Sequence, residues 1–277
     1  MSKWRSGLRM STLILQTRGV DMCELLGISS KVPYDFRAEL KNFFKHCNEN
    51  PHGWGIMYKK DGERRIVKEP VSADSSTKLP RLVSQLDSQN VLIAHIRYAT
   101  VGAKNNENTH PFERYDDSGR RWTLIHNGTI FSGNVLTKYK QTQKGTTDSE
   151  RILLYLIEQI NQKIREKNEQ DLDAEERFSV LNQVVCDITH RNKVNLMIYD
   201  GEYLYAHKNM KDTLSFKRTE DGIVLATKPI DDGNWIPLPM TTLLSFKDGK
   251  LIREGTNHGN VFVSYKESMN IFDGMNI

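Results

Sequence analysis

The sequence predicts an α+β fold in which helices cover β-sheets. Short apolar segments with strand character recur along most of the chain, and two long amphipathic helical segments interrupt them near its middle. Strands that outnumber helices in this way favour layered sheets over a helix bundle. The 277 residues are 38% hydrophobic and 27% charged, which is ordinary for a globular protein.

In the N-terminal half, the pair Asp61-Gly62 predicts a tight hairpin between two strands. The segment Val101–Arg120 shows no periodicity, and an unstructured stretch of this length within a compact domain is typical of a functional loop. The other elements are a helical face formed by Phe36, Leu40, Phe43, Phe44 and Cys47, a short helix over Leu79–Leu86, and strands at Cys23–Ser29, Gly53–Lys59, Arg65–Val71, Val91–Thr100 and Trp122–Phe131.

In the C-terminal half, Thr147-Asp148-Ser149-Glu150 is the pattern of a capping box and predicts the start of a helix. Its apolar face runs from Ile152 to Ile164, and a charged linker over Arg165–Glu176 leads to a second helix around Phe178–Ile188. The remaining predicted strands are Val194–Tyr199, Gly201–Lys208, Gly222–Thr227, Thr241–Phe246 and Lys250–Arg253.

The net charge of +4 is concentrated at the N-terminus. Four basic residues and one acid lie within Met1–Asp21, so residues 22–277 carry a net charge of only +1. That balance gives no support to a nucleic-acid partner, and no segment approaches the roughly 20 apolar residues that cross a membrane. The three cysteines, Cys23, Cys47 and Cys186, are too few and too scattered for a disulfide framework, so we expect a cytoplasmic protein.

Met1–Met22 precede a cysteine that could begin a mature protein. The apolar run Thr12–Leu15 is shorter than the core of a secretory signal. We expect residues 1–22 to be a leader, an extension or a mis-started segment, and 23–277 to form a single domain.

Cys23 is the first candidate catalytic residue. An N-terminal cysteine carries a thiol and an α-amine on one Cα, and the amine, with a pKa of about 8, can serve as the base that activates the thiol. The alternative is a small buried hydrophobic residue, which is what most free cysteines are.

Arg97 is the first candidate for substrate binding. Strand alternation places it on one face with His95 and Ala99, among apolar neighbours. A buried guanidinium needs an anion, and its planar fork suits a carboxylate. The alternatives are a structural ion pair or a strand end that reaches water.

Asn127-Gly128 and Asp148 complete the candidate site. The Asn127 amide and the next backbone N–H could form an oxyanion hole, although Asn-Gly is also the strongest short hairpin signal. Asp148 could bind a substrate ammonium, or could simply favour the helix dipole. His110 could order the long loop or lie near the thiol. The eight histidines form no HxH or HxxxH pair, so we expect no metal.

Together these residues resemble the class II glutamine amidotransferase domain, a branch of the N-terminal nucleophile hydrolases, in its stand-alone bacterial form. The resemblance covers nearly all of residues 22–277. The motifs that carry it are Met22-Cys23-Glu24-Leu25-Leu26-Gly27, Gly53-Trp54-Gly55, His95-Ile96-Arg97-Tyr98-Ala99-Thr100, Thr109-His110-Pro111, His126-Asn127-Gly128 and Thr147-Asp148-Ser149-Glu150.

The resemblance implies a four-layer α/β/β/α sandwich and no cofactor. It implies that Cys23 attacks a glutamine side-chain amide and that Asn127 and Gly128 hold the oxyanion. Arg97 would bind the α-carboxylate and Asp148 the α-ammonium, while Tyr98 and Thr100 lead into a loop that closes over the substrate. The larger synthases of the family usually carry His where this chain has Val101, and they add a synthase domain.

Three functions follow as hypotheses. The first is a glutaminase that supplies ammonia to a separate acceptor or synthase protein. The second is a hydrolase of γ-glutamyl peptides similar to glutathione, and the third is a non-catalytic glutamine-binding module. For all three we expect a γ-glutamyl small molecule as the ligand.

Overall fold

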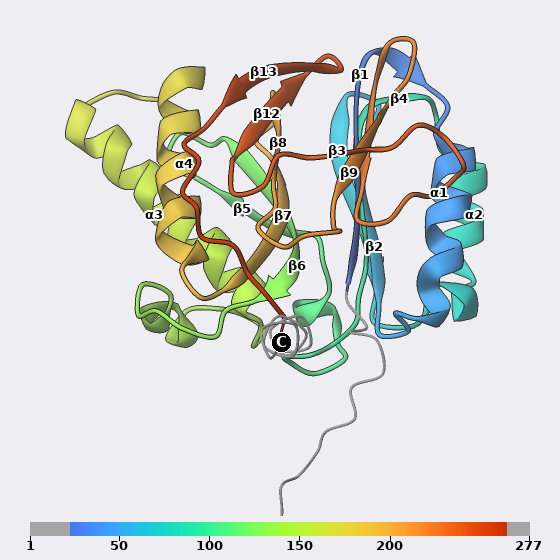
Figure 1. Cartoon of the computed structure of the whole chain (residues 1–277), viewed down its shortest axis with the longest axis horizontal. Coiled ribbons are helices and arrows are strands. Elements are labelled where there is room, and N and C mark those ends of the chain that lie inside the picture. Colours follow the sequence, from blue (N-terminus) through green and yellow to red (C-terminus); the bar gives the residue numbers. More distant parts are fainter. Residues whose placement is uncertain (1–22, 265–277) are drawn as a thin grey trace, which may run out of the picture.

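Two antiparallel β-sheets face each other, with helices on both outer sides, in the computed structural model, which describes residues 23–264 (Figure 1). The strand order is β11-β9-β10-β1-β4-β2-β3 in the first sheet and β13-β12-β8-β7-β6-β5 in the second. Helices α1 and α2 cover the first sheet, and α3 and α4 cover the second (Figure 1). The predicted four-layer sandwich is therefore confirmed, whereas the segment expected at residues 1–22 lies outside the described residues.

The first sheet is centred on β1, which pairs with β10 on one side and β4 on the other. The hairpin predicted at Asp61-Gly62 joins β2 and β3, and both turn residues have the positive φ, 53° and 78°, that a type I′ turn requires. The strands are β1 (Glu24–Tyr34), β2 (Trp54–Lys60), β3 (Glu63–Glu69), β4 (Gln89–Ile96), β9 (Ser215–Arg218), β10 (Gly222–Ala226) and β11 (Ile236–Pro237).

In the second sheet β6 pairs with the central strand β7, although both long helices separate the two strands in the sequence. Its strands are β5 (Phe112–Tyr115), β6 (Arg121–Thr129), β7 (Lys193–Tyr199), β8 (Leu204–His207), β12 (Leu244–Lys247) and β13 (Lys250–Glu254). The helices are α1 (Arg37–Phe44), α2 (Lys78–Ser84), α3 (Asp148–Lys167) and α4 (Ala174–Thr189), with short 3₁₀ turns at Lys45–Asn48, Ala73–Ser75, Asn106–Asn108 and Thr137–Gln141.

Three apolar clusters correspond to the three interfaces between the layers. One joins α1 and α2 to the first sheet, one lies between the sheets, and one joins the second sheet to α3 and α4. Strand alternation decides the membership: on β1, Leu26 and Ile28 face the helices, whereas Leu25 faces the other sheet. None of the helices within residues 23–264 is both long and apolar enough to cross a membrane.

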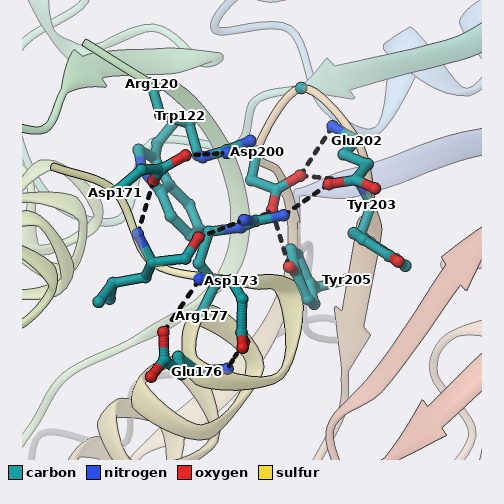
Figure 2. A network of polar contacts seen from close by, with 12 residues as sticks. Arg120, Trp122, Asp171, Asp173, Glu176, Arg177, Asp200, Glu202, Tyr203 and Tyr205 are labelled. Atoms are coloured by element: carbon teal, nitrogen blue, oxygen red, sulfur yellow. Dashed lines mark hydrogen bonds and ion pairs between the residues drawn. The ribbon is translucent and has the colours of Figure 1, made fainter. Parts of the chain in front are cut away.

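A buried polar network fastens α4 to the turn between β7 and β8 (Figure 2). The Arg177 guanidinium donates to Asp200 Oδ2 (2.9 Å), Glu202 Oε2 (2.7 Å) and the Leu172 carbonyl (2.7 Å). Asp200 also accepts from the Tyr205 hydroxyl at 2.8 Å. Because both ends of the Arg177–Asp200 pair are buried, its geometry fixes how the helix sits on the sheet.

The prediction is wrong at the end of β4 and misses three short strands. Strand β4 ends at Ile96 rather than Thr100: the Arg97 N–H still donates to the Gly53 carbonyl, but the N–H groups of the next two residues donate to side chains, Tyr98 to Cys23 Sγ and Ala99 to His52 Nδ1. The segment predicted to be unstructured contains β5, whose four residues are too few to show a period. The short strands β9 and β11 also lie where none was predicted.

The capping box predicted at the start of α3 is only half formed. The Thr147 hydroxyl accepts from the Glu150 N–H at 3.3 Å, as expected. The Glu150 carboxylate, however, accepts from the backbone N–H groups of Lys144 (2.9 Å) and Gly145 (2.7 Å). The Glu150 side chain therefore binds the loop before the helix instead of accepting from the Thr147 N–H, which would have completed the capping box.

Candidate active site

Four polar side chains meet on the facing surfaces of the two sheets, at one end of the sandwich. Their positions follow from strand alternation, in which residues two apart face the same side. Cys23 shares the inner face of β1 with Leu25, and Arg97 continues the inner face of β4 beyond Ile93 and His95. Asn127 follows the inward Ile125 on β6 by two residues, and Lys193 shares the inner face of β7 with Met197. The start of β1 and the end of β6 both lie at the bottom of Figure 1.

Cys23 lies half-buried, and the backbone of Tyr98 holds its sulfur. The Tyr98 N–H donates to Sγ at 3.2 Å, and the thiol donates to the Tyr98 carbonyl at 3.3 Å. Burial raises the pKa of the Cys23 thiol, and the Tyr98 N–H with the charges of Lys193 and Arg97 only partly offsets this. The thiol is therefore protonated at neutral pH, and a nucleophilic role requires a base.

Arg97 is buried and faces the long loop rather than a carboxylate. Its guanidinium donates to the carbonyls of Val101 (3.0 Å), Gly102 (3.3 Å) and Ala103 (3.0 Å). No Asp or Glu among residues 23–264 forms an ion pair with it, so the structural ion pair considered from the sequence is not formed there. A buried cation with neutral acceptors retains the capacity to bind an anion.

Asn127-Gly128 does not form the hairpin that the dipeptide suggested. Both residues lie inside β6, opposite Asn195 and Val194 of β7. A Cβ on Gly128 would lie 2.0 Å from the Lys193 carbonyl oxygen, so glycine is needed here for close approach of the strands. Asn127 Oδ1 accepts from Lys193 Nζ at 2.8 Å, while its buried Nδ2 has no acceptor among the described residues.

Asp148 begins α3 and is almost fully buried. Its carboxylate accepts from the backbone N–H groups of Ile130 (2.8 Å) and Ser149 (2.9 Å). Among the described residues no Lys or Arg forms an ion pair with it. After burial, the negative charge of Asp148 is a further influence that raises the pKa of the Cys23 thiol.

The other predicted substrate-binding residues, His110, Tyr98 and Thr100, differ in how deeply they are buried. His110 is buried and stacks on His95, with ring centroids 4.0 Å apart, and its carbonyl packs against Gly55. Thr100 is exposed on the loop, and Tyr98 reaches the thiol only through its backbone. The substrate-binding roles of His110, Tyr98 and Thr100 stay predictions.

Sequence reasoning missed two residues of this site. Asn108 donates to the Ala103 carbonyl (3.1 Å) and accepts from the Thr146 N–H (2.7 Å), so it ties the long loop to the residues before α3. Lys193 is the other, and a lysine at the inward-facing start of an apolar strand was a signal available in the sequence. Within residues 23–264 no cluster of three or more His, Cys, Asp or Glu side chains could hold a metal ion.

The model of the family described as glutamine amidotransferases class-II matches residues 22–220. The protein MJ1515 of Methanocaldococcus jannaschii is 29% identical over 83% of this chain and 71% of its own length. YafJ of Escherichia coli K12, a candidate glutamine amidotransferase, is 30% identical over 67% of this chain and 72% of its own. The γ-glutamyl-hercynylcysteine sulfoxide hydrolase of Mycolicibacterium smegmatis is 26% identical over 75% and 83%.

Solved structures agree on the fold. A predicted glutamine amidotransferase from Pseudomonas aeruginosa PA01 superposes with a TM-score of 0.57 at 22% identity, over 83% of this chain and all of that one. The glutamine phosphoribosylpyrophosphate amidotransferase of B. subtilis gives a TM-score of 0.64 at 15% identity, over 86% of this chain and 50% of that chain. At sequence identities this low, the structural similarity supports only the fold, the four-layer sandwich.

Proposed function

The chain belongs to the class II glutamine amidotransferases, and on that premise we propose that it cleaves the side-chain amide of a γ-glutamyl compound with the Cys23 thiol as nucleophile. The observation that carries the proposal is the Asn127 amide: its NH₂ group is buried without an acceptor among the described residues, on the inner face of the second sheet, opposite the inner face of the first sheet where Cys23 lies. A donor in that state suits an oxygen that gains negative charge during a reaction.

Activation of the thiol explains why the protein would begin at Cys23. Burial raises the thiol pKa, so the sulfur must transfer its proton as it attacks. With Cys23 as the first residue, its own α-amine takes that proton, whereas a peptide nitrogen in the printed 277-residue chain cannot. We therefore propose that residues 1–22 are absent from the active form and that residue 23 onwards forms one domain.

The substrate would bind as a zwitterion at its α-carbon. A carboxylate is a stronger acceptor than a carbonyl, so it would draw Arg97 donors away from the loop carbonyls of residues 101–103. The α-ammonium would meet Asp148. Tyr98 and Thr100 would border the substrate as the loop closes, and His110 would support that arrangement from beneath through His95.

The reaction would run in two steps. The Cys23 thiolate adds to the γ-carbonyl carbon, and the oxygen takes the negative charge between Asn127 Nδ2 and the Gly128 N–H. The C–N bond breaks, the Cys23 α-amine passes the proton it took from the thiol to the leaving nitrogen, and a γ-glutamyl thioester remains. Water then adds to the thioester, releasing glutamate and regenerating the thiol.

The identity of the leaving group distinguishes two candidate activities. Glutamine would release ammonia, which a separate acceptor or synthase protein could use, whereas a γ-glutamyl peptide would release an amine product. The Mycolicibacterium relative, named as a γ-glutamyl-hercynylcysteine sulfoxide hydrolase, favours testing the second class alongside glutamine.

The test compares protein whose N-terminus is shown by intact mass to be Cys23 with the full 277-residue chain. We expect glutamate release from glutamine or a γ-glutamyl peptide only from the former, and a loss of at least about a thousandfold in Cys23→Ala. Equal turnover by Cys23→Ala would refute the mechanism. Glutamine binding by calorimetry without glutamate release would identify a non-catalytic binding module instead.

A further inference from the structure

We propose that Lys193 is a positioning residue of this site, whose ammonium group holds the Asn127 amide with its NH₂ group toward the reacting oxygen and keeps positive charge beside Cys23. This inference rests on the proposed function and extends it to a residue outside the motifs that define the site.

The register of the central strands places Lys193 for this role. Asn127 lies opposite Asn195, and Lys193 lies two residues before Asn195 on β7, opposite Thr129. Residues two apart on a strand share a face, so Lys193 and Asn127 both face the first sheet. Lys193 is 7% exposed, and its Nζ donates to Asn127 Oδ1 at 2.8 Å.

The chemistry of the pair allows one orientation of the amide. A lysine ammonium has three donors and no acceptor, whereas an asparagine amide has an acceptor oxygen at one end and two donors at the other. A half-turn of the amide would direct NH₂ at the ammonium and lose the bond. Lys193 therefore fixes Oδ1 toward itself and the NH₂ group away from itself, and this is the group that has no acceptor in residues 23–264.

The charge of Lys193 also acts on the nucleophile. Burial lowers the pKa of Lys193 to about 8, and the Cys23 thiolate opposes that shift. Reciprocally, Lys193 lowers the pKa of the Cys23 thiol. Within residues 23–264, the other charged or titratable groups whose charge affects these two residues include Arg97 after β4, Asp148 on α3 and His126 on β6. Most of the Lys193 population is thus charged at pH 7, and a charged donor polarises the amide it binds.

The experiment replaces Lys193 by Met, which keeps most of the length of the side chain and removes its charge. Lys208→Met is the matched control, because Lys208 is also a buried lysine, 2% exposed, but donates to the Thr213 carbonyl rather than to Asn127. We expect Lys193→Met to lower kcat by about 10- to 100-fold with KM changed less than about threefold, and Lys208→Met to leave both unchanged. Lys193→Arg, which keeps the charge, should recover part of kcat.

A double-mutant cycle separates positioning from general packing. If Lys193 acts through Asn127, then Lys193→Met should cost little more once Asn127 is alanine. Additive losses in the double variant, a rise in KM without a fall in kcat, or equal effects of Lys193→Met and Lys208→Met would each overturn the proposal.

Alkylation of Cys23 by iodoacetamide gives a readout independent of turnover, in the full chain as well as in the form that begins at Cys23. Cys47→Ser and Cys186→Ser changes leave one thiol to follow. We expect Lys193→Met to move the midpoint of the pH–rate profile upward by about one unit, and Lys208→Met not to move it. An unchanged midpoint refutes the charge coupling. A shifted midpoint in a chain that hydrolyses no γ-glutamyl substrate refutes the proposed function while retaining the coupling.

Discussion

At the scale of single residues, the site depends on histidines that stay neutral. His95 and His110 stack between the sheets, and His95 Nε2 lies 3.3 Å from the His126 carbonyl oxygen. Burial lowers the pKa of His95 to about 3 and that of His110 well below its usual value. Because Arg97 already contributes a buried positive charge nearby, neutral rings fill the space beneath it without adding repulsion.

These histidines predict a loss of stability in acid. An unfolded His95 binds its proton near pH 6.5, whereas the folded one does so only near pH 3, so the unfolded state binds more protons between these values. The free energy of unfolding should therefore fall as pH drops below 6.5, by about 1.4 kcal/mol per pH unit for this one group. Urea unfolding at a series of pH values measures that slope.

The control for this prediction is a pair of glutamine variants. His95→Gln should reduce the slope between pH 6 and pH 4 by about one proton equivalent, whatever it does to stability at pH 7. His190→Gln, at an exposed position, should leave the slope as it was. Identical slopes in wild type and His95→Gln would mean that His95 titrates normally in the folded protein.

At the scale of elements, glycines let segments approach more closely than any side chain permits. A Cβ on Gly55 of β2 would lie 2.1 Å from the His110 carbonyl oxygen, and 2.9 Å from Pro111 Cδ. Residues 110–111 of the long loop therefore pack directly on the backbone of β2. This contact seats His110 against His95, so a motif without reactive atoms still shapes the site.

Gly55→Ala should destabilise the protein by about 1–3 kcal/mol, because backbone atoms must move to admit the methyl group. Gly27→Ala on β1 is the matched control: its closest neighbour is the Met197 sulfur at 2.4 Å, at the end of a flexible side chain that can turn aside. Denaturant unfolding should show the larger loss for Gly55→Ala. The reverse order would contradict the close approach at β2.

At the scale of the whole molecule, polar anchors as well as apolar cores join the layers. The Arg177 network of Figure 2 connects α4 to the second sheet through Asp200, Glu202 and the Tyr205 hydroxyl. Asp200 also accepts from the Glu202 and Tyr203 N–H groups, closing the turn between β7 and β8. A single buried carboxylate thus sets both a turn and the docking of a helix.

Arg177→Met should cost about 3–5 kcal/mol, because it leaves Asp200 as a buried charge without its cation. Arg165→Met is the control, since Arg165 and its partner Asp117 have side chains 61% and 52% exposed, and loss of such a pair should cost less than about 1 kcal/mol. Chemical denaturation of both variants measures the difference. Similar losses of unfolding free energy in the two variants would show that the Arg177 network does not stabilise the packing of α4 on the sheet.

The class of fold and the candidate residues were accessible from the sequence because they depend on local patterns. Period-2 and period-3.6 spacing identified the long strands and helices, and the turn at Asp61-Gly62 follows from two residues that tolerate positive φ. Short strands such as β5 carry too few residues for a period, so tertiary pairing alone defines them. The cysteine, arginine, Asn-Gly and aspartate candidates were visible because each residue type suits a particular chemistry.

The sequence by itself determined the layered fold, the candidate nucleophile and the groups suited to a γ-glutamyl substrate, since each is encoded in neighbouring residues. The tertiary structure decided between the strand predicted over Trp122–Phe131 and the hairpin that Asn127-Gly128 also favoured: β7, far along the chain, pairs with the dipeptide, so the strand continues through it. The tertiary structure alone also showed that Lys193 donates to the Asn127 amide and that Arg97 donates to loop carbonyls. These contacts join residues distant in sequence, and strand register, which no local pattern specifies, brings them together.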